Sequence, residues 1–148
     1  GSGYDAFALL QPTSPLRTAF HIQECHKLFK HTGERSCLSV NSVESTLLKS
    51  FVAREGRLFP LEAGKYSEQR RQDLPDVVKP NGAIYMQDSA LFKHGGTFIP
   101  QGSSYYLMGR RQSVDIDTEE DLLLAERYLC EMDSESTGSG KDHGKAQA

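Results

Sequence analysis

The 148-residue chain carries a formal net charge of −3, with 37% apolar and 25% charged residues, and its isoelectric point is near 6.0. This composition is typical of one soluble globular domain, and the lack of a basic surface argues against a nucleic-acid partner. No apolar run approaches the roughly 20 residues that cross a bilayer, and no basic-then-apolar leader opens the sequence, so we expect a cytoplasmic protein without a membrane partner. Three scattered cysteines, an odd number, predict reduced thiols.

The first third of the chain predicts a strand, a helix and a second strand. Residues 4–10 form an apolar run that stops before Pro12, where proline removes a backbone donor and favours extended geometry. Thr18 is placed to cap a helix over residues 19–31, whose apolar side chains fall on one stripe. Residues 37–43 then alternate apolar and polar side chains. This order predicts an α/β fold with a right-handed parallel crossover.

The middle of the chain interrupts this pattern. Residues 44–79 contain short apolar pieces separated by glycine and proline, and we expect them to form a hairpin-rich arm outside the main sheet. Further elements are expected at 82–86 (strand), 89–94 (helical turn), 105–108 (strand) and after a capping box that begins at Thr118 (helix). Residues 133–148 have almost no apolar content, which predicts a disordered tail after a domain over 4–132.

Two polar segments are candidates for a functional site. The loop at 11–17 follows a strand at its carboxyl end, where open α/β sheets place ligands, and its donors and acceptors suit a base, a ribose or a phosphate. The alternative is a proline-braced loop with Arg17 in solvent. Asp115 and Asp117, two residues apart in extended backbone, point the same way and offer the hard oxygen ligands that Mg²⁺ prefers. The acids at 119–121 are better explained as a first helical turn that complements the helix dipole.

A third candidate is the basic stretch around Arg70 and Arg71, with Lys65 and Lys79 nearby. A guanidinium can bind a carboxylate through two parallel hydrogen bonds, so this stretch could clamp an acidic substrate. The alternative is a solvated loop.

Three long motifs, in this order and at these separations, resemble one family. YDAFALLQPTSPLRT, RRQDLPDVVKPNGAIY and SVDIDTEEDLLLAE resemble the acylneuraminate cytidylyltransferases, or CMP-sialic acid synthetases, and relatives that activate legionaminic and similar acids. The resemblance runs from about Tyr4 to Leu129. It implies a Rossmann-like nucleotidyltransferase sheet with a small dimerisation arm, a homodimer, and a reaction in which the sugar's anomeric hydroxyl attacks the α-phosphate of CTP and releases pyrophosphate.

The resemblance also implies roles for individual residues. Gln11 and Asn81 would face the sugar, and Tyr85 and Phe98 would line the pocket for its N-acyl group. The other four matched positions carry charge: Arg71 and Lys49 would reach from the arm toward the substrate carboxylate in the partner subunit's site, and Asp115 and Asp117 would hold Mg²⁺ against the triphosphate.

One part of the family pattern is missing from the sequence. Such enzymes begin with a strand and a Gly- and Lys-rich loop that wraps the CTP phosphates, and nothing before Tyr4 supplies it. We therefore expect a sheet that is incomplete at the N-terminus and an isolated chain that is truncated and inactive. Two alternatives stay open: a non-catalytic fragment or interaction module that keeps the fold and the dimer arm, and a cytidylyltransferase for another sugar acid such as 3-deoxy-manno-octulosonate.

Overall fold

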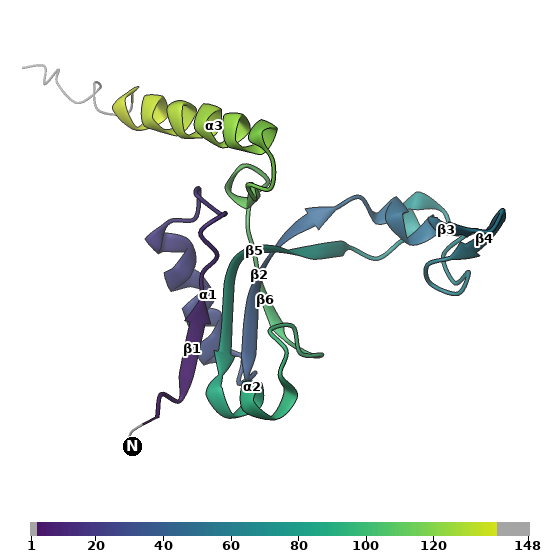
Figure 1. Ribbon diagram of the computed structural model, residues 1–148, viewed down its shortest axis with the longest axis horizontal. Coiled ribbons are helices and arrows are strands. Elements are labelled where there is room, and N and C mark those ends of the chain that lie inside the picture. Colours follow the sequence, from purple (N-terminus) through teal and green to yellow (C-terminus); the bar gives the residue numbers. More distant parts are fainter. Residues whose placement is uncertain (1–2, 139–148) are drawn as a thin grey trace, which may run out of the picture.

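A computed structural model describes residues 3–138 of the chain, with side chains through residue 134. These residues form nine helices and strands, joined by three short 3₁₀ turns, and Figure 1 shows their arrangement. In chain order they are β1 (Ala6–Leu9), α1 (Ala19–His31), β2 (Ser36–Val43), η1 (Ser45–Lys49), β3 (Phe51–Arg54), β4 (Arg57–Pro60), η2 (Arg71–Asp73), β5 (Val77–Asp88), α2 (Ser89–Gly95), β6 (Ser104–Leu107), η3 (Arg111–Ser113) and α3 (Glu119–Gly138).

The main sheet mixes parallel and antiparallel strands in the order β1-β5-β2-β6. β5 runs antiparallel to both of its neighbours, and β2 runs parallel to β6. β1 and β2 therefore point the same way, as the predicted parallel crossover requires, but β5 lies between them. The predicted α/β class is confirmed, with a mixed sheet and three helices.

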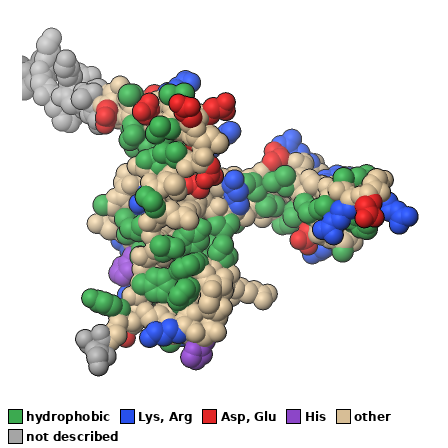
Figure 2. Space-filling view, in the orientation of Figure 1, with side chains coloured by type: hydrophobic (Ala, Val, Ile, Leu, Met, Phe, Trp, Pro, Cys, Tyr) green, Lys and Arg blue, Asp and Glu red, His purple; other side chains and the backbone are tan. Residues whose placement is uncertain are grey.

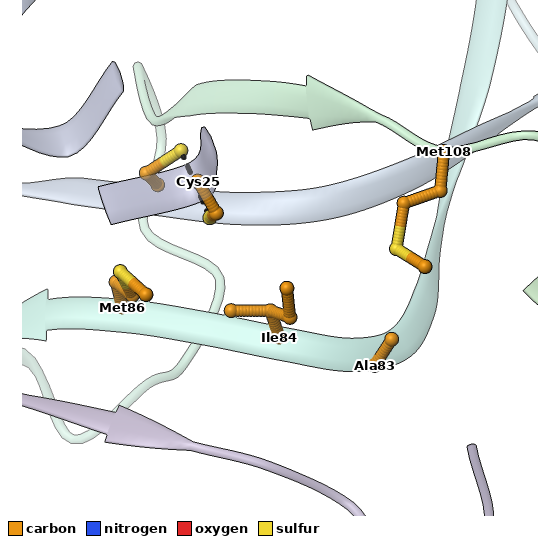
Figure 3. Close-up of a cluster of buried hydrophobic side chains, with 6 residues drawn as sticks. Cys25, Ala83, Ile84, Met86 and Met108 are labelled. Atoms are coloured by element: carbon orange, nitrogen blue, oxygen red, sulfur yellow. Dashed lines mark hydrogen bonds between the residues drawn. The ribbon is translucent and has the colours of Figure 1, made fainter. Parts of the chain in front are cut away.

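The main core lies between α1 and the sheet. Six buried residues form it: Cys25, Cys37, Ala83, Ile84, Met86 and Met108 (Figure 3). The predicted stripe of α1 is confirmed, since its apolar side chains pack against this cluster. Gly33, with a φ of 72°, follows the helix in the left-handed conformation that ends it. The three cysteines are free thiols, as expected, although Cys25 Sγ donates a hydrogen bond to Cys37 Sγ over 3.5 Å.

The predicted arm is present and projects sideways from the sheet (Figure 1). β3 and β4 pair as an antiparallel hairpin whose two turn residues, Glu55 and Gly56, have φ angles of 48° and 73°. Positive φ at both positions is the conformation whose twist matches that of a two-residue hairpin. The arm is shorter than predicted, because residues 77–79 belong to β5.

The helix α3 begins as predicted and ends later. Thr118 Oγ1 accepts a hydrogen bond from Asp121 N (3.3 Å), and Asp121 Oδ2 accepts one from Thr118 N (2.9 Å), which completes the expected capping box. Residues 133–138 continue the helix, so a disordered tail from 133 is wrong for them; the remainder of that prediction lies outside the described residues.

Over residues 3–138, none of the helices has the length and apolar character needed to span a membrane.

Candidate functional site

The loop after β1 is held against β5 by Arg17. Its Nη1 donates hydrogen bonds to Gln11 O (2.8 Å) and to Ala83 O (2.9 Å), and Ser14 inside the loop is buried. These two hydrogen bonds connect the loop to β5 through the Arg17 guanidinium, so the alternative of Arg17 in solvent is wrong. The loop therefore presents Gln11 in a fixed position beside the middle of β5.

The middle of β5 contains a bulge. Leu38 pairs with Tyr85 and Val40 with Pro80, so two steps along β2 correspond to five along β5. Gly82, in the bulge, has a φ of 79° and is buried. Bulges of this kind often re-aim side chains next to functional sites. Here the bulge brings Gly82 next to Gln11, and Gln11 and Asn81 line the same cavity.

A cavity of about 600 Å³, within the size range of small-molecule sites, opens beside this bulge. Its walls come from the loop after β1, from β2, from β5, from the segment after β6 and from the first turns of α3. It is lined by Gln11, Asn41, Lys79, Pro80, Asn81, Gly82, Tyr85, Arg110, Ser113, Val114, Asp115, Asp117, Asp121, Leu124 and Tyr128. Five predicted site residues lie on it together: Gln11, Asn81, Tyr85, Asp115 and Asp117. Figure 2 shows acidic and basic side chains next to each other below α3, at the base of the arm.

The neighbours of Asp115 fix its backbone, but one of its carboxylate oxygens has no hydrogen-bond partner. The preceding Val114 is buried in a small cluster with Leu16 and Ala125, and the following Ile116 N donates to Thr13 O over 2.9 Å. Asp115 Oδ1 is buried without a hydrogen-bond partner. Asp115 lines the polar cavity, and a carboxylate with an oxygen that has no partner in the protein is suited to a cation.

The other two acids on the cavity differ from each other. Asp117 is exposed, whereas Asp121 is the capping residue of α3, and the hydrogen bonds from Thr118 hold its pKa below the ordinary value of 3.8. The helix-terminus explanation of Asp121 is therefore confirmed, although the residue also lines the cavity. Within the described residues, no three Cys, His, Asp or Glu side chains group as a metal site. Magnesium is commonly held by one or two carboxylates plus substrate oxygens, so the pair Asp115 and Asp117 is chemically sufficient.

The two predicted aromatic residues lie beside each other. Burial raises the pKa of the Tyr85 phenol and the charge of Asp115 raises it further, so the hydroxyl stays a neutral donor at neutral pH. The Phe98 ring lies 6.3 Å from that of Tyr85 and stacks on Phe92 at 4.7 Å. Phe98 does not itself line the cavity but supports the ring that does.

The two predicted residues of the arm are not brought to this cavity. Arg71 Nη2 pairs with Glu44 Oε2 at 3.1 Å, and Lys49 Nζ donates to Gln69 O at 2.8 Å. Both contacts lie within the arm. A role in a partner subunit's site is compatible with this position and stays a prediction.

Sequence reasoning missed three polar residues of the cavity: Asn41, Arg110 and Ser113. Lys79 was named as a neighbour of the basic stretch that could clamp an acidic substrate, and the structure places it on the cavity. Arg110 and Ser113 follow β6 in a segment without periodicity, and nothing in the sequence marks them. Lys79 and Arg110 are the cavity's two basic lining residues.

No family model matches the chain, but curated proteins are similar to it. An N-acylneuraminate cytidylyltransferase of Streptococcus agalactiae serotype V is 31% identical over 118 residues, which cover 79% of this chain and 28% of the relative. An N-acylneuraminate cytidylyltransferase of Escherichia coli O18:K1:H7 is 34% identical over 128 residues, or 82% and 29% of the two chains. A CMP-N,N′-diacetyllegionaminic acid synthase of Legionella pneumophila is 31% identical over 138 residues, or 90% and 57%.

The chain thus spans 28% and 29% of the length of the first two relatives and 57% of the third. The aligned part nevertheless includes most of the chain, as the three sequence motifs indicated. The chain is a homologue of the N-acylneuraminate cytidylyltransferases and of the related CMP-legionaminic and pseudaminic acid synthases.

Proposed function

We propose that the chain forms the sugar-acid side and the metal side of a cytidylyltransferase site, in which CMP passes from CTP to the anomeric hydroxyl of sialic acid or a related nonulosonic acid and pyrophosphate leaves. The supporting observation is the cavity, which Gln11, Asn81 and Tyr85 line together with Asp115 and Asp117. The mixed sheet would then be part of a Rossmann-like nucleotidyltransferase sheet.

Magnesium is the metal that fits these carboxylates. Asp115 and Asp117 would hold it, and the unpartnered Asp115 Oδ1 gives it a ligand that the protein does not otherwise use. A divalent cation here would neutralise charge that develops on transferring phosphate oxygens. The chain's own contribution is to hold both carboxylates facing the sugar side of the cavity.

An acidic sugar also needs positive charge near its carboxylate. Lys79 and Arg110 line the cavity in the same chain. Arg71 and Lys49 would approach from the arm of a second copy, as the family resemblance implies. The ion pair between Arg71 and Glu44 is at the surface, with 75% of the Arg71 side chain exposed, so a substrate carboxylate could replace Glu44 at small cost.

We expect N-acetylneuraminate, in the presence of Mg²⁺, to raise the melting temperature of the chain. A ligand at about 100 times its Kd stabilises a folded protein by about 2.7 kcal/mol. N-acetylmannosamine, which lacks the carboxylate, should give no shift, and 3-deoxy-manno-octulosonate, which lacks the N-acyl group, should give a smaller one. Thermal melts with each compound measure these shifts.

The matched variants for this test are Tyr85→Ala and Tyr105→Ala. Tyr85 lines the cavity, whereas Tyr105 is 56% exposed on β6 and does not. Only Tyr85→Ala should weaken protection by N-acetylneuraminate. A chain that responds to none of the acids would contradict the proposal and favour an interaction module.

The arm is proposed as the dimer contact. Its hairpin exposes apolar side chains, among them Leu58 at 68% and Phe59 at 49%, and Figure 2 shows apolar side chains along the arm. Exposed apolar patches of this kind mark interaction surfaces.

We expect the double change Leu58→Asp and Phe59→Asp to convert a dimer into a monomer, because two charges would have to be buried in the contact. Sedimentation velocity over a range of concentrations measures this. Phe20→Asp is the control, since Phe20 is equally apolar and 61% exposed on α1. A dimer that is unaffected by the arm change, or that dissociates equally with the control, would place the contact elsewhere.

A further inference from the structure

Asn81 is predicted to face the sugar, yet its amide is already bonded inside the protein. Its Oδ1 accepts hydrogen bonds from Ser39 Oγ (2.6 Å) and Ala83 N (3.2 Å), and its Nδ2 donates to Ser113 Oγ (2.9 Å) and Met108 Sδ (3.4 Å). The residue is 5% exposed. An amide has two acceptor lone pairs and two N–H donors, so every site on Asn81 is occupied.

Ser39 forms the inner end of this arrangement. It lies on β2, is 1% exposed and does not line the cavity. Its Oγ donates to Asn81 Oδ1 and accepts from Ile84 N at 2.8 Å. Ser39 and Asn81 together satisfy the backbone N–H groups of Ala83 and Ile84, which the bulge removes from regular pairing.

Ser113 forms the outer end. Its Oγ accepts from Asn81 Nδ2 and donates to Gly109 O over 2.8 Å. Two residues later comes Asp115, whose backbone is fixed on the far side by the bond from Ile116 N to Thr13 O. The hydroxyl of Ser113 therefore ties the segment that carries the acidic pair to the bulge of β5.

We propose that Ser39, Asn81 and Ser113 form a positioning relay that sets the Asp115 carboxylate for its cation. In this arrangement Asn81 acts through Ser113 and the backbone, and its effect on the sugar is indirect. The inference rests on the proposed metal-binding role of Asp115 and Asp117. Residues that orient metal ligands without touching the metal change metal affinity substantially, so the relay has a measurable consequence.

The test measures Mn²⁺ binding to the full chain by electron paramagnetic resonance, with no sugar or nucleotide present. Ser39→Ala and Ser113→Ala should each weaken Mn²⁺ binding about ten-fold, the lower end of the effect of second-sphere partners. Ser113→Thr, which keeps the hydroxyl, should restore most of the affinity. The matched control is Ser36→Ala, because Ser36 is a buried serine of the same strand whose Oγ lies 2.6 Å from Ser103 Oγ, away from the cavity.

Each outcome decides the inference. Equal weakening by Ser36→Ala would assign the effect to lost stability, and weakening by Ser113→Ala alone would make Ser113 a direct ligand; either result overturns the relay. A wild-type chain that does not bind Mn²⁺ overturns it as well. A chain that binds Mn²⁺ through the relay but is not stabilised by N-acetylneuraminate would support the relay and refute the proposed function.

Discussion

Asp115→Asn is expected to remove cation binding while leaving the fold intact. Asp115 Oδ1 is buried without a partner, so the carboxylate contributes no hydrogen bond at that atom to the folded state. Losing a ligand should weaken Mg²⁺ or Mn²⁺ binding by at least about 100-fold, because even changes beyond the ligands cost ten- to 100-fold. The melting temperature should stay the same or rise slightly, since this half-buried carboxylate has one buried oxygen without a hydrogen-bond partner.

Cation affinity and melting temperature measured on three further variants show whether the effect is specific to the proposed metal ligands or common to any acidic residue near the start of α3. Asp117→Asn should also weaken cation binding, because Asp117 lines the same cavity. Asp121→Asn should lower the melting temperature instead, since Asp121 Oδ2 accepts three hydrogen bonds from the backbone and side chain at the start of α3. Glu119→Gln, in the same helical turn but not on the cavity, is the neutral control. Unchanged Mn²⁺ affinity in both Asp115→Asn and Asp117→Asn would refute the metal assignment.

Elements with a strong local signal could be predicted from the sequence. The stripe of α1, the glycine after it and the capping box at Thr118 all depend on neighbours within a few positions, and local chemistry decides them. The extension of α3 through 133–138 was missed for a related reason: low apolar content predicts the absence of a core contact, but a helix that is already nucleated needs no core contact to continue.

The order of the strands could not be predicted in the same way. A strand–helix–strand pattern fixes the relative direction of β1 and β2, but β5, which follows some 30 residues after β2 ends, is inserted between them through long-range pairing. The bulge at Asn81 arises from that pairing too, because it exists only relative to the register of β2. Reasoning from residues alone therefore could not show that Asn81 is enclosed by Ser39 and Ser113.

The residues of the candidate site also divide into those with a local sequence signal and those placed by long-range contacts. The carboxylate pair could be found from its spacing, since alternation in extended backbone places both side chains on one side. Arg110 could not, because its place on the cavity depends on the segment after β6. Lys79 could be found only as a basic neighbour of the arm, because its place on the cavity depends on the bulge. The arm residues Arg71 and Lys49 lie outside this chain's cavity, because both make their contacts within the arm.

Gly82→Ala is expected to close the sugar side of the cavity. A Cβ at this position would overlap Gln11 Oε1 and lie 3.4 Å from Asp115 Oδ2. The φ of 79° is itself unfavourable for alanine, at about 1–2 kcal/mol. The free energy of unfolding should fall by at least that amount, and Gln11 would have to leave its place beside Asp115. Protection by N-acetylneuraminate should then weaken about ten-fold or more, as expected when a positioned hydrogen-bonding group is lost.

Two companion variants divide this effect into its causes. Gly102→Ala has the same backbone strain, with a φ of 80°, but meets nothing within 4 Å, so it should lose stability without affecting acid binding. Combining Gly82→Ala with Gln11→Ala removes the overlapping side chain. The double variant should regain the stability lost to overlap but not the binding, because Gln11 is then absent from the cavity. If Gly82→Ala loses no more stability than Gly102→Ala and binds the acid normally, Gln11 does not depend on Gly82 for its position, and the sugar side of the site must be assigned to other residues.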